Sequence, residues 1–545
     1  MRPMLGLSLV CALMCLLAVD RANAGEGNPD GYPERWNSVN GDFGTDEGLA
    51  KFIALLKESK NAGCTHIMVG DGRWLKFPDD KPYIERVQKA KAAAKELNLT
   101  LLVGVASMGY SGRYFHFDAN LAAGLPVKEE TFIVKGKTAL PDPALALDTS
   151  KIVQEGDQFI GNAKMRPFTN YMLTCSMHTD KAPEDMEFWI TSSGGKRRNG
   201  VLNPVYTKEG DHLKMQMTFN SLEGDEVKVR LGNGKIKITD LKIESAGLLL
   251  IVRRQLVPLT VTSEDGKTVY EEGKDFEKII DPCLAQTPFP GETTITHKPA
   301  EFKLTEGSRI KDGEKLKLTF WHTQRIYTDQ DCISLEDPKV MEILETEFTN
   351  AHKIWNLTGY MLGYDEIRMG GFEPQPDGKH LKPGELLAAH FKHMYDFVKK
   401  TVPDAKVYTW SDMFTPYHNA FSLADKNQYY YLVNGNWDGS WEGVPKDVII
   451  LNWYAPKAEG VKFFADRGNP QIIAGYYDGR SEKEWKNNIA GWKKVLEGQP
   501  NILGFMYTTW NHNYKNMQPY FKTLDTFKDW GAATTAKPVA EPGVK

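Results

Sequence analysis

Two adjacent acids, Asp365 and Glu366, have the residue types and the position best suited to chemistry in this chain. They end a short apolar run, residues 360–366, of the length and composition of a buried strand. A positioned carboxyl group can donate and accept a proton, and a second one can stabilise developing positive charge. Neighbouring strand residues point to opposite faces, so both acids reach one substrate only if the chain turns at the strand end. The glycines within 368–371 permit such a turn.

Acids, amides and aromatic side chains also end most of the other apolar runs. They include Asp71, Arg73, His322, Trp410, Asp412, Trp453, Tyr454, Tyr477, Asp478 and Trp510. If the runs are parallel strands of one barrel, their carboxyl ends meet at the face where barrel enzymes hold reactive groups. Acids beside aromatic rings suit glycosidic bond hydrolysis, because one carboxyl protonates the leaving oxygen, a negative group supports the oxocarbenium-like transition state and rings hold the sugar. Packing alone would instead favour aliphatic residues up to the strand ends.

Eight short apolar runs alternate with amphipathic stretches along most of the chain. The runs are 65–69, 99–106, 316–322, 360–366, 406–412, 448–454, 471–478 and 502–510. The helical stretches are 83–97, 338–356, 383–401, 459–467 and 481–497. This alternation predicts an α/β fold, a (β/α)8 TIM barrel with Asp365 and Glu366 on the fourth strand. A doubly wound open sheet is the competing interpretation, but no GxGxxG follows the first run.

The alternation breaks between the second and third runs. There, residues 121–300 show short alternating runs with Gly-containing turns, which predict an inserted antiparallel β-sandwich. Within it, residues 238–247 resemble the closing strand of jelly-roll carbohydrate-binding modules; a domain that only braces the barrel or narrows its mouth is the alternative. The barrel would comprise residues 25–120 and 301–531. Residues 532–545 lack apolar periodicity and are predicted to be disordered.

The first 24 residues have the pattern of a secretory signal. Arg2 precedes an apolar stretch, and Ala22-Asn23-Ala24 fits a small-x-small cleavage site. A membrane anchor is the alternative, but the apolar stretch is shorter than the ~20 residues that span a bilayer. We therefore expect a secreted or periplasmic protein. Its four remaining cysteines permit disulfides without requiring them.

The charge pattern limits the classes of partner. The net charge is −4, and lysines and glutamates are interleaved without a basic stripe. This excludes nucleic acid and membrane surfaces as expected partners and favours an oligosaccharide, polysaccharide or glycoconjugate. The chain has no CxxC pair and no HExxH helix, so we expect neither a metal nor a cofactor.

The segment Gly363-Tyr364-Asp365-Glu366 matches the Gly-x-Asp-Glu motif of family 20 glycoside hydrolases, the β-N-acetylhexosaminidases. Trp410 and Asp412 on the fifth run and Trp510 on the eighth support the match. The chain resembles that family over the barrel, roughly residues 35–120 and 301–531. The resemblance implies retaining, substrate-assisted hydrolysis of a terminal β-linked N-acetylhexosamine.

The resemblance also implies roles for individual residues. Glu366 would act as general acid and then base, while Asp365 would orient the 2-acetamido group of the substrate. Further side chains would bind the sugar: Tyr454 or Tyr477 at the acetamido oxygen, Trp410, Trp453 and Trp510 around the ring, His322 on the third strand, and Asp71 and Arg73 at the outer hydroxyls.

Two other functions fit the same residues. In a conventional glycosidase, Glu366 would be the acid/base and Asp478 or Asp412 the nucleophile. In a non-catalytic glycan-binding protein, the aromatic residues would hold the sugar and the two acids would be ordinary polar caps. The run at residues 113–118, which follows the second strand, either lines the pocket or leads into the insertion.

Overall fold

The computed structural model describes residues 34–525, except 77, 157, 180–187, 193–196, 199–203, 232–235, 327–329, 379, 421–431, 455–458, 477 and 479–480. The predicted signal segment, the predicted disordered tail and Tyr477 therefore lie outside the described residues.

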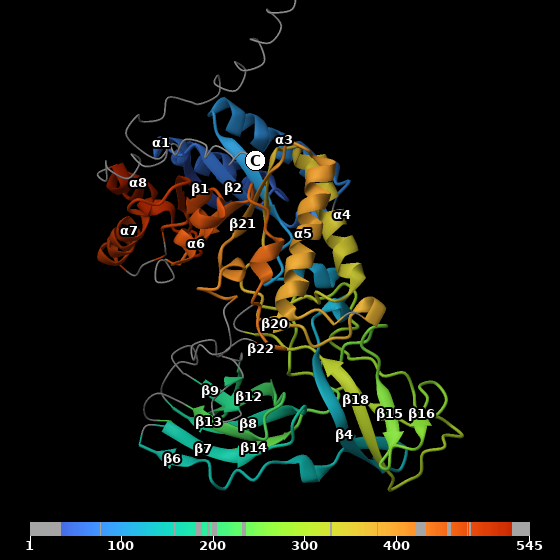
Figure 1. Cartoon of the computed structure of the whole chain (residues 1–545). Coiled ribbons are helices and arrows are strands. Elements are labelled where there is room, and N and C mark those ends of the chain that lie inside the picture. The colour runs from blue at the N-terminus through green and yellow to red at the C-terminus, as the bar shows by residue number, and fades with distance from the viewer. Residues whose placement is uncertain are drawn as a thin grey trace, which may run out of the picture. The chain divides into compact units, whose positions relative to one another are not determined.

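Eight parallel strands form a closed barrel, as the sequence predicted. Around the barrel they are β1 (Glu34–Asn40), β2 (His66–Gly70), β3 (Thr100–Val105), β19 (Gly359–Leu362), β21 (Lys406–Trp410), β23 (Ile449–Asn452), β24 (Gln471–Ile473) and β25 (Ile502–Tyr507). Figure 1 labels β1, β2 and β21 among them. The number of strands and their direction are those of a TIM barrel.

The prediction was wrong about two members of this barrel. Residues 316–322 belong to β18 (Lys315–His322), which pairs antiparallel with β4 (Leu125–Lys135) and β15 (Thr260–Ser263). Burial alternates along β18, the pattern of a half-buried antiparallel strand. The first barrel strand, β1, was missed because its sequence is largely polar. The two errors offset each other, so β19 is still the fourth strand.

Helices follow most barrel strands. They are α1 (Asp46–Asn61), α2 (Arg73–Lys76), α3 (Lys81–Glu96), α4 (Pro338–Trp355), α5 (Pro383–Thr401), α6 (Glu459–Arg467), α7 (Glu482–Leu496) and α8 (Met517–Asp525). Helix α4 shows why the boundaries were readable: the Asp337 side chain accepts a hydrogen bond from the Lys339 backbone N–H, Pro338 opens the helix, and Asn356 ends it in the left-handed conformation.

The insertion follows the run 99–106, as predicted; this run is the third barrel strand, β3, and not the second, because β1 precedes it in the barrel. It carries antiparallel sheets in the orders β10-β9-β13-β7-β6, β11-β12-β8-β14 and β16-β15-β18-β4-β5-β17. Besides β4, β15 and β18, their strands are β5 (Thr138–Pro141), β6 (Val153–Glu155), β7 (Gln158–Lys164), β8 (Asn170–His178), β9 (Phe188–Ser192), β10 (Arg197–Arg198), β11 (Val205–Glu209), β12 (His212–Asn220), β13 (Glu226–Leu231), β14 (Lys237–Ser245), β16 (Val269–Tyr270) and β17 (Phe302–Lys303). The expected antiparallel strands are present; their packing as a sandwich stays a prediction.

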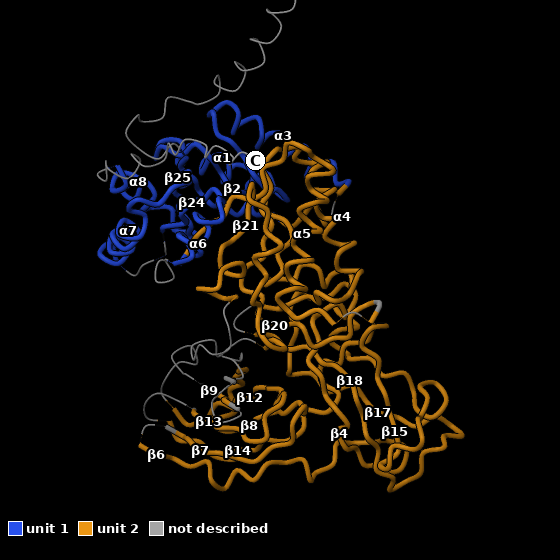
Figure 2. The backbone as a smooth tube through the Cα atoms, viewed as in Figure 1, with its two compact units in different colours: residues 1–71, 79–103, 454–545 blue, residues 72–78, 104–453 orange. Residues whose placement is uncertain are grey.

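By its internal contacts the chain divides into two compact units (Figure 2). Unit 1 comprises residues 1–71, 79–103 and 454–545, and unit 2 comprises 72–78 and 104–453. Unit 1 contains a buried apolar cluster that includes Phe505 and Trp492. Unit 2 contains the whole insertion and the segments after β19 and β21, so it holds both Asp365 and Glu366.

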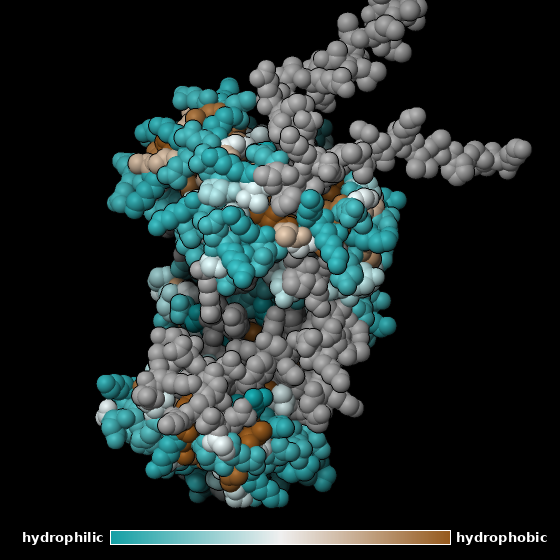
Figure 3. All heavy atoms as spheres, turned by 90° about the vertical axis from the view of Figure 1, so that its left-hand side faces the viewer, coloured by the Kyte–Doolittle hydropathy of each residue, from teal (hydrophilic) through white to brown (hydrophobic). Residues whose placement is uncertain are grey.

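The face drawn in Figure 3 is largely hydrophilic, with hydrophobic residues in small separate patches. Isolated apolar side chains of this kind are normal on a protein surface. Within the described ranges no helix has the length and apolar character needed to cross a bilayer. The four cysteines left open by the sequence, Cys64, Cys175, Cys283 and Cys332, are buried and unpaired.

Candidate active site

The fourth and fifth barrel strands bring three acids to one place. Strand β19 pairs in register with β21, with Leu362 opposite Thr409. The segments that continue from these two strands carry Asp365 and Glu366 on one side and Asp412 on the other. The Glu366 backbone N–H donates a hydrogen bond to the Asp412 carboxylate, 2.9 Å from N to Oδ2.

The chain turns at Glu366 itself. Its φ of 49° lies in the left-handed region, which residues other than glycine seldom adopt. The hydrogen bond to Asp412 helps to hold this conformation. A turn thus occurs earlier than in the predicted segment 368–371, where Met369–Gly370 form the short strand β20, paired with β22 (Leu432–Val433). The strict alternation of strand side chains therefore does not apply to Asp365 and Glu366.

Three neighbours hold the Glu366 carboxylate. Oε2 accepts hydrogen bonds from the Tyr110 hydroxyl and from Gln330 Nε2, the latter at 2.6 Å. Oε1 lies 2.7 Å from a guanidinium nitrogen of Arg368, whose side chain is only 4% exposed. A charged partner and two neutral donors fix the orientation of this carboxylate. Tyr110, Gln330 and Arg368 were not among the predicted site residues, because no local sequence pattern shows that they converge.

Gly109 is required for the close approach of the segment after β3. A Cβ atom at this position would lie 2.0 Å from the Asp365 carbonyl oxygen and 2.8 Å from the Glu366 carbonyl oxygen. The segment is fixed alongside by the Met108 backbone N–H, which donates to the Gly363 carbonyl at 2.8 Å. Only glycine leaves room for the backbone of the two acids.

Asp412 is fully buried and accepts hydrogen bonds at both oxygens. Besides the Glu366 N–H, Asn419 Nδ2 donates to Oδ2 at 2.8 Å and the Trp453 indole donates to Oδ1 at 3.3 Å. Burial raises the pKa of Asp412 to about 6, against the lowering effect of the Glu366 hydrogen bond. Asp412 was a predicted binding residue; it lies in direct contact with the catalytic candidates.

The pKa of the Asp365 carboxyl is also raised, so this group keeps its proton at a higher pH than an ordinary aspartate. Burial raises its pKa well above the usual range, and the negative charges of Asp412 and Glu366 raise it further. Closely spaced carboxyls titrate as a group, so a proton is retained among them at mildly acidic pH. A carboxyl that keeps its proton at the working pH can serve as a general acid.

Two predicted indoles lie in the same unit as these acids. Trp410 ends β21 and is buried, and Trp453 follows β23 and is half-buried. The Trp453 ring lies 4.8 Å from the His418 ring, centroid to centroid. Because its N–H points to Asp412, Trp453 connects the sixth strand to the acid cluster.

Four predicted residues lie in unit 1. Asp71 is buried and accepts a hydrogen bond from the Tyr83 hydroxyl at 2.8 Å. Tyr454 and Trp510 are exposed at the surface, 40% and 53% respectively. Asp478 supports the segment after β25: one oxygen accepts from the Thr509 hydroxyl and the other from the backbone N–H groups of Trp510 and its neighbour. Both Asp478 oxygens are thus engaged within unit 1.

Two further predicted residues belong to unit 2. Arg73 opens helix α2. His322 ends β18 in an antiparallel sheet, so the expectation that it lies on the third barrel strand was wrong. Its Nε2 is 2.9 Å from Asn220 Nδ2 and its Nδ1 is 3.1 Å from the Thr323 carbonyl oxygen. Burial lowers the pKa of His322 to about 4, as expected for a neutral core histidine.

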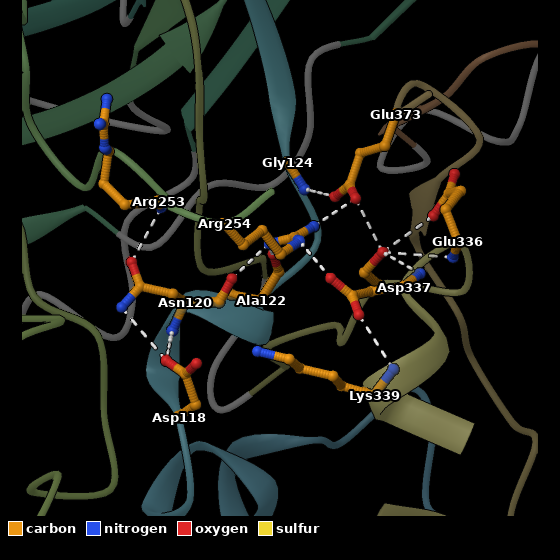
Figure 4. A network of polar contacts seen from close by, with 11 residues as sticks. Asp118, Asn120, Ala122, Gly124, Arg253, Arg254, Glu336, Asp337, Lys339 and Glu373 are labelled. Atoms are coloured by element: carbon orange, nitrogen blue, oxygen red, sulfur yellow. Dashed lines mark hydrogen bonds and ion pairs between the residues drawn. The ribbon is translucent and has the colours of Figure 1, made fainter. Parts of the chain in front are cut away.

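A buried ionic network joins the insertion to the segment after Glu366 (Figure 4). Arg254, between β14 and β15, is 3.2 Å from Asp337 and also pairs with Glu373. Its Nη1 donates to the Ala122 carbonyl at 2.9 Å. Asp337 caps α4 and Glu373 follows β20, so a single guanidinium links three parts of unit 2. This contact favours the alternative that the insertion braces the barrel.

Replacing Arg254 with Met should lower the free energy of unfolding by about 3–5 kcal/mol, because two buried carboxylates lose their charged partner. Arg253→Met is the matched control: that side chain pairs with Glu272 and both are partly exposed, so about 1 kcal/mol or less is expected. Urea unfolding of both variants measures the difference. Equal effects would show that the Arg254 network contributes no more than a surface pair.

No group of three His, Cys, Asp or Glu side chains in the described part of the chain is arranged to hold a metal ion.

No family model and no curated protein matches this chain. Among solved structures, it is similar to the rhamnosidase of Novosphingobium sp. PP1Y, with 11% identity and a TM-score of 0.33 over 93% of this chain and 59% of that one. It is also similar to the GH20 catalytic modules of the pneumococcal exo-β-D-N-acetylglucosaminidase StrH, with 9% identity and a TM-score of 0.36 over 91% and 84%. It is similar to the chitobiase of Flavobacterium johnsoniae as well, with 8% identity and a TM-score of 0.32 over 91% of this chain and 51% of that one. The chain thus spans less than two thirds of the rhamnosidase and of the chitobiase. Likenesses this distant do not establish an activity.

Proposed function

We propose that this protein is a glycoside hydrolase that acts through the carboxyls of Asp365, Glu366 and Asp412. The observation that carries the proposal is the acid cluster after the fourth and fifth barrel strands, in which Asp365 and Asp412 have raised pKa values and Glu366 is ion-paired. Cleavage of a glycosidic bond needs a group that delivers a proton and a group that carries negative charge. The indole of Trp453, which donates to Asp412, supplies a ring beside these groups.

The proposed substrate is a terminal β-linked N-acetylhexosamine. Glu366 takes up the proton that the cluster retains and gives it to the leaving oxygen, the acetamido oxygen of the substrate attacks the anomeric carbon, and Asp365 orients the acetamido group. Water then opens the intermediate with Glu366 as base. The turn at Glu366 supports this division of roles, because it frees the two adjacent side chains from strict alternation. We also propose, from the first 24 residues, that the enzyme is secreted or periplasmic.

The second candidate is a two-carboxylate glycosidase in which Glu366 works with Asp412. The hydrogen bond between the Glu366 backbone and Asp412 favours this residue as the second carboxylate. Asp478, the other carboxylate open to this candidate, accepts hydrogen bonds from Thr509 and from the Trp510 backbone.

A panel of 4-nitrophenyl glycosides with and without the 2-acetamido group tests both candidates. Release confined to acetamido sugars, together with inhibition by a thiazoline mimic of the intermediate, is the result expected for substrate assistance. Release from sugars that lack the group, without thiazoline inhibition, would support the Glu366–Asp412 mechanism. Glycan binding without release from any member of the panel would contradict a hydrolase.

Activity should fall as pH rises through about 6. The raised pKa of Asp412, about 6, and that of Asp365 mean that the acid cluster loses its proton only at this pH and above. Because these two pKa values are raised in the folded protein, the folded state binds protons more tightly than the unfolded chain. The stability that results is complete below the ordinary Asp pKa and is lost as the pH rises through about 6. Measuring kcat/KM and Tm from pH 4 to 8 checks both slopes. An activity that rises between pH 6 and 8 would contradict a proton-holding cluster.

A further inference from the structure

A polar pocket adjoins the acid cluster on the side of Tyr110. Its volume is about 330 Å³, at the small end of ligand pockets and large enough for one sugar-sized group. Tyr110, Arg113, His116, Glu292, Arg325 and Asp331 line it, all within unit 2. Because the Tyr110 hydroxyl also donates to Glu366, one side chain belongs to both the pocket and the acid cluster.

Arg325 is the side chain most available to a ligand. Its Nη1 is 3.1 Å from Glu292, but the Glu292 side chain is 71% exposed, so water competes for this contact. The Arg325 Nε is buried and has no hydrogen-bond partner in the described part of the chain. The terminal nitrogens of Arg325, paired with this exposed glutamate, are the donors that a ligand in the pocket meets.

The second guanidinium is held in place from behind. Arg113 lies 3.0 Å from Glu347, whose side chain is fully buried. The pair therefore fixes where Arg113 stands at the pocket wall. Two guanidinium groups, one fixed and one weakly paired, present the planar donors that bind carboxylate and sulfate oxygens.

The two acids of the pocket, Asp331 and Glu292, do not cancel the preference of the two guanidinium groups for an anion. Asp331 is buried in the wall, where it accepts a hydrogen bond from the Thr293 hydroxyl at 2.9 Å. Its burial raises its pKa to about 6, so its negative charge is partly lost at mildly acidic pH. Glu292 is exposed and can leave Arg325 when another anion binds.

We propose that this pocket binds an anionic substituent, a carboxylate or a sulfate ester, on a sugar unit of the substrate. The inference rests on the proposed function and narrows its substrate to an acidic glycan. The incoming anion replaces Glu292 at the terminal nitrogens of Arg325. Tyr110 then places the acidic unit beside the bond that Glu366 acts on.

Calorimetric titration at pH 6 and constant ionic strength tests the pocket without hydrolysis. The probes are sodium glucuronate, sodium sulfate and, as a neutral control, methyl β-glucoside. Saturable binding of glucuronate alone identifies a uronate, binding of sulfate alone a sulfated sugar, and binding of both an anion site that accepts either. Binding of neither anion, or equal binding of the neutral sugar, would overturn the proposal.

Variants locate the site. Arg325→Gln should weaken anion binding at least tenfold. Arg325→Lys should weaken it less, because the charge remains. Glu292→Gln should strengthen anion binding several-fold, because it removes the competing carboxylate. Arg467→Gln, on α6 in unit 1, is the control and should change nothing. Unchanged binding in Arg325→Gln, or an equal loss in Arg467→Gln, would overturn the assignment. This inference and the proposed function can fail separately. If neither anion binds but Glu366→Gln still removes hydrolysis, the pocket assignment is wrong and the proposed function stands.

Discussion

Replacing Glu366 with Gln should reduce kcat/KM about 1,000-fold while leaving ligand affinity within a few-fold of the wild type. The amide keeps the shape of the side chain and can still accept from Tyr110 or Gln330, but it can neither give nor take a proton. Loss of general acid–base catalysis typically lowers rates by about 100- to 10,000-fold, and a 1,000-fold loss corresponds to about 4 kcal/mol in the activation barrier.

Steady-state kinetics on the best glycoside of the panel, with binding measured by calorimetry, separates chemistry from affinity. Glu342→Gln is the matched control, because this glutamate is exposed on α4 and should give wild-type rates. If Glu366→Gln keeps more than a tenth of the wild-type turnover, Glu366 is not the proton-transferring group and the role passes to Asp365 or Asp412.

Gly109→Ala should lower kcat about 100-fold although residue 109 bears no reactive group. The added Cβ would lie 2.0 Å from the Asp365 carbonyl oxygen, so either the segment after β3 or the backbone of the two acids must shift by about 1 Å. A displacement of this size at a catalytic group can reduce the rate about 100-fold. The free energy of unfolding should also fall by about 1–3 kcal/mol, the usual effect of overpacking.

Gly491→Ala is the matched control for this prediction. Gly491 lies in helix α7, where a Cβ would meet no atom within 4 Å, so the change should leave kcat unaltered and stabilise the helix by up to about 1 kcal/mol. Thermal unfolding of both variants shows whether Gly109→Ala still unfolds cooperatively. Wild-type kcat in a cooperatively folded Gly109→Ala variant would show that the backbone of the acids tolerates the shift.

The identity of the barrel strands shows where sequence patterns were insufficient. β18 is strongly apolar and was taken as a barrel strand, whereas β1 is polar and was missed. β1 is polar but buried in part: Asn37 is fully buried, and its amide nitrogen donates to the Ser59 hydroxyl on α1 at 2.9 Å. Strand hydrophobicity alone cannot show whether a buried amide will find a partner from a helix.

The position of Asp365 and Glu366 could be predicted, but their surroundings could not. The apolar run and the Gly-x-Asp-Glu motif placed them at the end of the fourth strand. Their partner Arg368 lies two residues beyond Glu366, but Tyr110 and Gln330 lie far from the two acids in the sequence, and no spacing relates them to the acids. The engagement of Asp478 with the segment near Trp510 also required the structure.

The sequence by itself determined the barrel class, the helices α3 to α7 and the apolar run that leads to the two acids, because periodicity and helix capping are local properties. Only the tertiary structure decided which strands close the barrel and how Asp412, Tyr110 and Gln330 surround Glu366. Those contacts join residues far apart in the chain, and they set the burial and charge on which the pKa values of Asp365 and Asp412 depend.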